Sequence, residues 1–291
     1  MDKQVNTQAL VDKAKTGSVV QKETFSAFLT KDAVKQKIND IVGGRDGMRF
    51  MTQILSAVTN NPDLQKCEPM TILNCGLLGE SLKLSPSPQL GQFYMVPFED
   101  NKAGITVATF ILGYKGYIQL AVRSGYYKKI NVLAIKEGEL VRYDALTEEL
   151  EVNLIEDDLE REKAKTTGYY AMFEYTNGFR KCLYWSKQKM ETHALKYSKG
   201  YAADKRKNTS WTFWSKDFDG MAYKTMLRQL ISKWGIMSIE MQTAFERDTT
   251  VEGDNGKPVY VDNSADGFES MQEGVLADGD SISSDGAKQE G

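Results

Sequence analysis

The run TGYYAMFEYTNGFRKCLYW, residues 167–185, constrains the fold more than any other part of the chain. It has the composition of two β-strands, and Asn177-Gly178 at its centre is typical of a tight turn between antiparallel strands. A second run, QFYMVPFEDNKAGITVATFIL, predicts another hairpin around EDNKAG. Strands are also predicted over residues 130–141 and 150–155. The middle of the chain is therefore predicted to form a mostly antiparallel sheet.

Helical patterns lie on both sides of these strands. Residues 24–59 show helical spacing in two pieces, and Pro69 opens a further helical segment that ends before Pro86. After the hairpin, Ser186 is a candidate helix cap, and a long helix is predicted from Asp217 to about Trp234. Helices, then antiparallel strands, then helices are typical of an α+β fold and not of alternating βαβ units.

Charge is distributed unevenly along the 291 residues. From residue 248 onward there are eleven acids and two lysines, a net charge of −9, whereas residues 180–233 carry +9. We predict a flexible N-terminus over residues 1–23, one domain over residues 24–247, and a disordered acidic tail over residues 248–291. A basic body beside an acidic tail favours a polyanion as the partner, and the alternative interpretation is a solvated lysine-rich face.

Several classes of function lack the residues that they need. Three cysteines and one histidine, His193, are too few for a structural zinc site. The nearest match to an ATP phosphate loop, GMAYKT, has tyrosine where the second glycine is required. No secretory signal and no membrane-spanning apolar run is present. We expect a cytoplasmic protein that is not an enzyme, uses no ATP and contacts Mg²⁺ only as a counterion.

The stretch ILGYKGYIQLAVRSGYYKKI, residues 111–130, combines four tyrosines with four cations and contains no acid. If residues 113–124 are helical, Tyr114 and Tyr117 share one face, and Lys115, Gln119 and Arg123 lie on another. We expect the tyrosines to pack in the core or border a groove, and the cations to meet phosphates.

Two further basic segments follow. The run KGYAADKRKNTSWTFWSK, residues 199–216, places a lysine-arginine cluster before two tryptophans. Cations attract phosphates and flat rings stack on unpaired bases, although the tryptophans would equally well hold a loop on the core. In the last long helix, Lys224 and Arg228 are predicted to lie opposite the buried face, where they would contact phosphates.

Two long motifs resemble one family. They are LGYKGYIQLAVRSGYYKKINV, preceded by GQFYMVPF and followed by EGEL, and DFDGMAYKTMLRQLISKWGIMSIEMQTA. Over residues 67–247 they look like the phage RecT family of single-strand annealing proteins. This resemblance implies binding of single-stranded DNA, annealing to a complementary strand without ATP, and assembly into rings or helical filaments. It also implies a phage or prophage protein that works beside an exonuclease in a bacterial cytoplasm.

The expected DNA-binding residues come from the three basic segments. They are Tyr114, Lys115, Tyr117, Gln119, Arg123, Lys128, Lys129, Lys205, Arg206, Lys207, Trp211, Trp214, Lys216, Lys224 and Arg228. For the acidic tail two interpretations stay open, contact with a host single-strand-binding protein and a purely solubilising role. The alternatives for the whole chain are a metal-dependent nuclease acting on the same DNA and an RNA-binding module.

Overall fold

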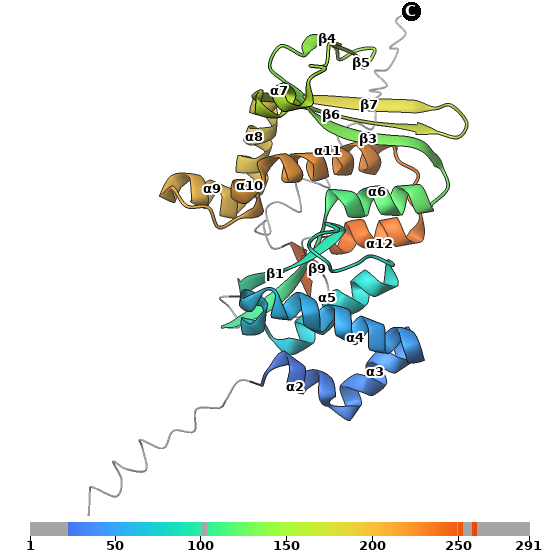
Figure 1. Ribbon diagram of the computed structural model, residues 1–291, viewed down its shortest axis with the longest axis vertical. Coiled ribbons are helices and arrows are strands. Elements are labelled where there is room, and N and C mark those ends of the chain that lie inside the picture. The colour runs from blue at the N-terminus through green and yellow to red at the C-terminus, as the bar shows by residue number, and fades with distance from the viewer. Residues whose placement is uncertain (1–22, 101–103, 249, 253–257, 261–291) are drawn as a thin grey trace, which may run out of the picture.

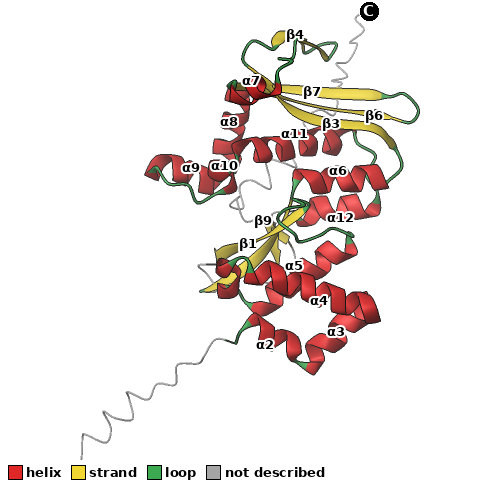
Figure 2. Cartoon of the chain, viewed as in Figure 1, coloured by secondary structure: helices red, strands yellow, loops and turns green. Residues whose placement is uncertain are grey.

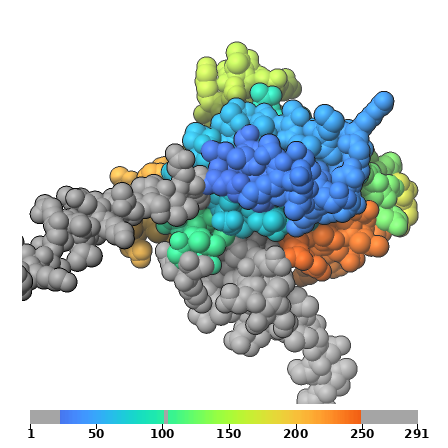
Figure 3. Space-filling model, turned by 90° about the horizontal axis from the view of Figure 1, so that it is seen from below, coloured from blue at the N-terminus to red at the C-terminus, as the bar shows by residue number. Residues whose placement is uncertain are grey.

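The structure is a computed structural model, and it describes residues 23–100, 104–248, 250–252 and 258–260. Most of the predicted flexible N-terminus and most of the predicted acidic tail lie outside these residues. Helices come first along the described chain, and they are α2 (Phe25–Thr30), α3 (Asp32–Val42), α4 (Gly44–Thr59), the 3₁₀ turn η1 (Pro62–Lys66) and α5 (Pro69–Ser81). Pro69 occupies the first turn of α5, as predicted. Seen from below, α2 to α4 form much of the surface (Figure 3).

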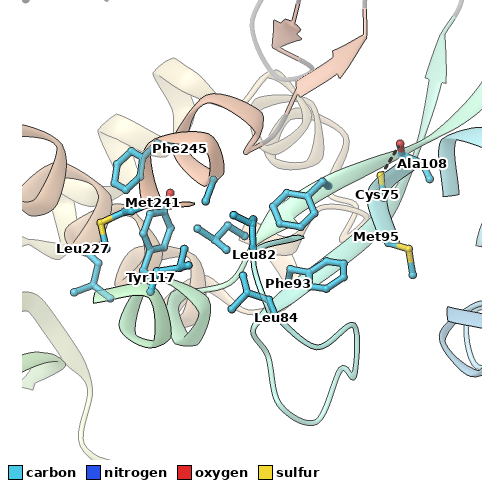
Figure 4. Close-up of a cluster of buried hydrophobic side chains, with 14 of the residues drawn as sticks. Cys75, Leu82, Leu84, Phe93, Met95, Ala108, Tyr117, Leu227, Met241 and Phe245 are labelled. Atoms are coloured by element: carbon cyan, nitrogen blue, oxygen red, sulfur yellow. Dashed lines mark hydrogen bonds between the residues drawn. The ribbon is translucent and has the colours of Figure 1, made fainter. Parts of the chain in front are cut away.

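The first sheet combines the predicted hairpin with two strands from the far end of the chain. Its order is β1-β2-β8-β9, made of β1 (Phe93–Asp100), β2 (Ile105–Leu112), β8 (Thr250–Glu252) and β9 (Pro258–Tyr260). Helix α5 packs on it, and the Cys75 thiol donates to the Ala108 carbonyl at 3.3 Å (Figure 4). Residues 250–252 and 258–260, which lie beyond the predicted domain end at residue 247, pair with this sheet.

The second sheet contains the hairpin that the Asn-Gly turn predicts. It has the order β3-β6-β7, made of β3 (Tyr127–Lys136), β6 (Thr166–Tyr175) and β7 (Arg180–Ser186). Gly178 adopts a φ of +87°, which glycine tolerates at low cost. A separate hairpin of β4 (Leu140–Asp144) and β5 (Glu149–Val152) and the short helix α7 (Asp158–Lys163) follow β3. The fold is α+β with antiparallel sheets, as predicted (Figure 2).

Three helices lie between the two sheets: α6 (Tyr114–Arg123), α11 (Phe218–Trp234) and α12 (Ile239–Arg247) (Figure 1). Their buried faces join one hydrophobic core that reaches both sheets. Tyr117 is fully buried there and packs edge-to-face on Phe245 at 5.0 Å (Figure 4). Gly116 allows the first turn of α6 to lie against the backbone of Gln92, because a β-carbon at this position would overlap the Gln92 carbonyl.

Three more helices complete the described chain, and they are α8 (Lys187–Tyr197), α9 (Lys199–Lys207) and α10 (Phe213–Lys216). Ser186 caps α8, as predicted, since its hydroxyl accepts from the Lys189 N–H at 3.2 Å. Helix α11 ends at Trp234, as predicted, and Gly235 is its C-cap. Helices α9 and α10 extend to one side of the molecule, beyond the start of α11 (Figure 1).

Candidate nucleic-acid interface

A buried carboxylate connects α6, α11 and the first sheet. Asp248 is 2% exposed, and its Oδ1 accepts from the Leu112 N–H at 2.9 Å and from Lys224 Nζ at 2.8 Å. Its Oδ2 accepts from the Tyr117 hydroxyl at 3.0 Å and from Arg228 Nη1 at 3.2 Å. Burial alone would raise the pKa of Asp248, but the charges of Lys224 and Arg228 and the hydrogen bonds from Lys224 and the Leu112 N–H together hold this pKa below its usual value. We call these five residues the Asp248 hub.

The hub corrects one part of the predicted site. Lys224 and Arg228 were expected on the solvent side of α11, but Lys224 is buried and the Arg228 side chain is 23% exposed. Both cations are paired with the same buried acid. The expectation that Tyr117 packs in the core is confirmed. Sequence spacing could not reveal this hub, because Leu112 and Asp248 are 136 residues apart.

Helix α6 divides its polar residues between structure and solvent. The Arg123 guanidinium donates to the carbonyls of Leu82 and Lys83, at 2.5 and 3.0 Å, just beyond the last residue of α5. Arg123 therefore holds the backbone at the end of α5. The sequence around Arg123, which contains no acid, did not indicate this structural role. Lys115 and Gln119 are exposed, whereas Tyr114 is half-buried and packs edge-to-face on Tyr223 at 5.5 Å.

Lys128 and Lys129 acquire an acid from the neighbouring strand. Glu174 on β6 accepts from Lys128 at 2.7 Å and lies 3.7 Å from Lys129. Both lysines remain exposed and line a hollow of about 530 Å³ together with Ile118 and Val122 of α6. Residues 111–130 contain no acid, but Glu174 neutralises part of their positive charge in the folded protein.

A second internal carboxylate organises the segment between α9 and α10. Asp204 is 4% exposed and accepts from the Thr209 hydroxyl at 2.6 Å, the Ser215 hydroxyl at 2.7 Å, and the N–H groups of Thr212 and Trp211 at 2.8 and 3.0 Å. These hydrogen bonds, of which the one from Thr209 contributes most, hold the pKa of Asp204 well below its usual range. The loop that carries Trp211 is thus held by hydrogen bonds to a buried carboxylate.

The two tryptophans of this segment have opposite surroundings. Trp214 is 7% exposed and packs on Phe218 and Tyr201, with ring centroids 5.2 and 6.0 Å away. Trp211 is 79% exposed. The interpretation that tryptophan holds the loop on the core is therefore right for Trp214, while Trp211 presents its ring to solvent.

Trp211 lines a hollow of about 790 Å³ between the β1–β2 hairpin and the α9–α10 segment. We call it the Trp211 hollow. Aromatic and basic side chains of its lining include Phe98, Trp211, Phe213, Trp214, Lys66, Lys199, Lys216 and Lys224. Lys66 is paired with Asp63 at 2.7 Å, but Lys199 and Lys216 form no ion pair with any residue in the described ranges. Of these lining lysines, Lys66 and Lys199 were missed by sequence reasoning.

The predicted cations of α9 lie outside this lining. Lys205 pairs with Glu191 at 2.8 Å and lies over the Tyr201 ring, while Arg206 and Lys207 are exposed in the last turn of the helix. Of the predicted residues, Trp211, Trp214, Lys216 and Lys224 line the Trp211 hollow.

The described part of the chain contains neither a cluster of metal ligands nor a helix that could span a membrane. Among the residues that the structure describes, no three His, Cys, Asp or Glu side chains gather as metal ligands. In that same part, each helix is too short or too polar to cross a bilayer.

Comparison with known proteins identifies the family. The model of the RecT family matches residues 48–261. This chain belongs to the RecT family. It is 38% identical over 250 residues to the uncharacterized protein YqaK of Bacillus subtilis (strain 168), covering 86% of this chain and 79% of YqaK. It is 26% identical over 235 residues to Protein RecT of Escherichia coli (strain K12), covering 79% of this chain and 82% of that protein.

RecT family membership implies single-strand annealing in DNA recombination, and with it binding of single-stranded DNA. The matched region contains every residue that lines the Trp211 hollow. It also extends through β8 and β9.

Proposed function

We propose that this RecT family chain binds single-stranded DNA along the Trp211 hollow and pairs it with a complementary strand without ATP. The observation that carries the proposal is the exposed ring of Trp211, a residue whose backbone N–H donates to Asp204, in a hollow that Lys199 and Lys216 also line. An exposed ring can stack on an unpaired base, which contributes about 1–3 kcal/mol per base, and the ammonium groups attract phosphates without regard to sequence.

Annealing on such a surface needs no chemical fuel. Each stacked step of a DNA duplex contributes about 1.4 kcal/mol, so pairing is downhill once repulsion between the strands is offset. Lysines of the hollow would offset this repulsion by neutralising phosphates of the first strand, while base edges stay open to the second strand. The absence of an ATP phosphate loop from the sequence agrees with this mechanism.

Not every predicted cation enters the proposal. Arg123, Lys224 and Arg228 are engaged by carbonyl or carboxylate groups of the fold, and the proposal leaves them in structural roles. The exposed cations outside the hollow are kept as further phosphate contacts, and they are Lys115, Lys128, Lys129, Lys205, Arg206 and Lys207. The exposed Gln119 is kept with them as a polar contact.

Assembly and partners form a second part of the proposal. We infer rings or helical filaments, because one hollow of this size holds few nucleotides and annealing needs a longer aligned strand. We also infer a phage or prophage origin, a bacterial cytoplasmic location, an exonuclease partner and contact of the acidic segment with a host single-strand-binding protein. Family membership supports these inferences, and purified pairs of proteins would test each contact.

The decisive experiment mixes two complementary labelled oligonucleotides with the protein, without ATP, across a salt series. The Lys199→Glu, Lys216→Glu double variant should anneal at least about tenfold more slowly, because two attractive charges become repulsive. Lys163→Glu with Lys165→Glu is the matched control, since both lysines are exposed and lie outside the hollow. If the unaltered protein gives no acceleration over spontaneous pairing at any salt concentration, the proposal is wrong.

Two added measurements separate the alternatives. Incubation of labelled single strands with protein and Mg²⁺ should leave them intact, whereas cleavage would favour a metal-dependent nuclease. Competition between RNA and DNA of the same sequence should favour DNA, whereas preference for RNA would favour an RNA-binding module.

A further inference from the structure

The segment that follows β9 has the opposite charge to the Trp211 hollow. Residues 261–291 contain eight acids and one lysine, a net charge of −7. Within it, Phe268 lies between Asp266 and Glu269. An aromatic side chain flanked by acids offers the two features of a nucleotide in single-stranded DNA, a flat ring and negative charge.

This segment starts from the sheet that lines the hollow. Strand β9 ends at Tyr260 and belongs to the sheet β1-β2-β8-β9, whose first two strands supply residues 95–99 and Thr106, Thr109 and Ile111 to the hollow. Three strand spacings correspond to about 15 Å. Phe268 lies eight residues beyond Tyr260, and eight residues span up to roughly 26–29 Å, so the hollow lies within reach of this segment.

We propose that residues 262–280 bind in the Trp211 hollow and compete there with single-stranded DNA, an inference that rests on the proposed function. Carboxylates of this segment take the place of phosphates at Lys199 and Lys216, and Phe268 takes the place of a base at Trp211. Because the segment is tethered, its local concentration is on the order of 1 mM, enough for a weak contact to be occupied. A long strand with many phosphates displaces it, and short or isolated anions do not.

The test compares two full-length variants with the same change in net charge. The first neutralises six acids of the segment by Asp→Asn or Glu→Gln substitution: Asp262, Asp266, Glu269, Glu273, Asp278 and Asp280. The control neutralises six exposed acids on and around β5 and α7 in the same way: Glu149, Glu151, Glu156, Asp158, Glu160 and Glu162. None of these control residues lines the hollow.

Affinity for a labelled oligonucleotide should rise about tenfold in the segment variant at low salt and less than twofold in the control. The difference should vanish near 1 M salt, where the Debye length falls to about 3 Å. Equal affinities of the two variants at low salt would overturn the inference.

A second measurement needs no DNA. A synthetic peptide of residues 262–280 is titrated calorimetrically into the segment variant at low salt, and binding should weaken at least tenfold when Trp211→Ala and Lys199→Glu are added. Absence of peptide binding, or binding unchanged by these substitutions, would overturn the inference. If the peptide binds as expected but no form of the protein binds the oligonucleotide, the proposed function fails and the docking of the segment stands.

Discussion

The Asp248 hub and the Trp211 hollow use the same kinds of side chain in opposite ways. In the hub, Lys224 and Arg228 meet a buried carboxylate, and a tyrosine hydroxyl completes the network. In the hollow, which Asp63 and Glu99 also line, neither Lys199 nor Lys216 forms an ion pair with an acid of the described ranges, and a tryptophan ring is exposed. Both regions come from basic, aromatic stretches of sequence.

The difference between the two regions is the position of the acid. Asp248 comes from a distant part of the chain and neutralises Lys224 and Arg228 of α11. Asp204 turns its carboxylate toward hydroxyl and N–H groups of its own loop and forms no ion pair with Lys199 or Lys216. A basic aromatic stretch therefore keeps its charge for a ligand where no acid of the fold pairs with its cations.

The largest expected effect comes from breaking the hub. Asp248→Ala leaves Lys224 charged and buried without its acid, which should lower the free energy of unfolding by about 3–5 kcal/mol. Urea denaturation measures this loss. Glu149→Ala, at an exposed position, should change the free energy of unfolding by no more than about 0.5 kcal/mol. A loss below about 1 kcal/mol for Asp248→Ala would show that the hub does not hold the fold.

The two tryptophans separate stability from binding. Trp214→Ala removes a buried ring and should lower the free energy of unfolding by about 3–5 kcal/mol. Trp211→Ala should leave stability within about 0.5 kcal/mol and weaken single-strand binding by about 1–3 kcal/mol. Denaturation and fluorescence anisotropy of a labelled oligonucleotide measure the two quantities. Unchanged binding in Trp211→Ala would show that Trp211 does not stack on a base.

Salt dependence reports on the lysines of the hollow. For single strands each phosphate contact contributes about 0.7 to the slope of log affinity against log salt, so Lys199→Glu with Lys216→Glu should reduce that slope by about 1.4. Lys163→Glu with Lys165→Glu should leave the slope unchanged. Equal slopes for both double variants would place the phosphate contacts elsewhere.

The substitution with the smallest effect at neutral pH concerns His193. Burial, assisted by the charges of Lys196 and Lys189, lowers the pKa of His193 from 6.5 to about 4. The unfolded chain therefore binds a proton that the folded chain does not, and the free energy of unfolding should fall as the pH drops from 6.5 to about 4. His193→Phe should remove this part of the pH dependence. Thermal unfolding across that range, compared with the unaltered protein, measures it, and an unchanged pH dependence would contradict the assignment.

Local signals predicted the elements well, because each acts within a few residues. The Asn177-Gly178 turn, the Ser186 cap and Pro69 at the start of α5 each act through backbone groups of their neighbours. The hub was not predictable in this way, since Leu112 and Asp248 meet only when the second half of the chain folds back onto the first.

The site was predictable only in part. Exposure of Trp211 and burial of Trp214 depend on Asp204, whose hydroxyl partners at Thr209, Thr212 and Ser215 recur every third residue. This recurrence is a local signal that sequence reasoning could have used. By contrast, the contribution of Lys66 to the hollow depends on packing between distant segments, so its role could not be read from spacing.

Photocrosslinking of a single strand tests the central claim most directly. An oligonucleotide with photoreactive thymine analogues is irradiated on the unaltered full-length protein, and the attached peptides are mapped by mass spectrometry. We expect attachment within residues 199–216 and residues 95–99, the two sides of the Trp211 hollow. Attachment confined to α6 and the start of β3, around Lys128 and Lys129, would contradict the claim.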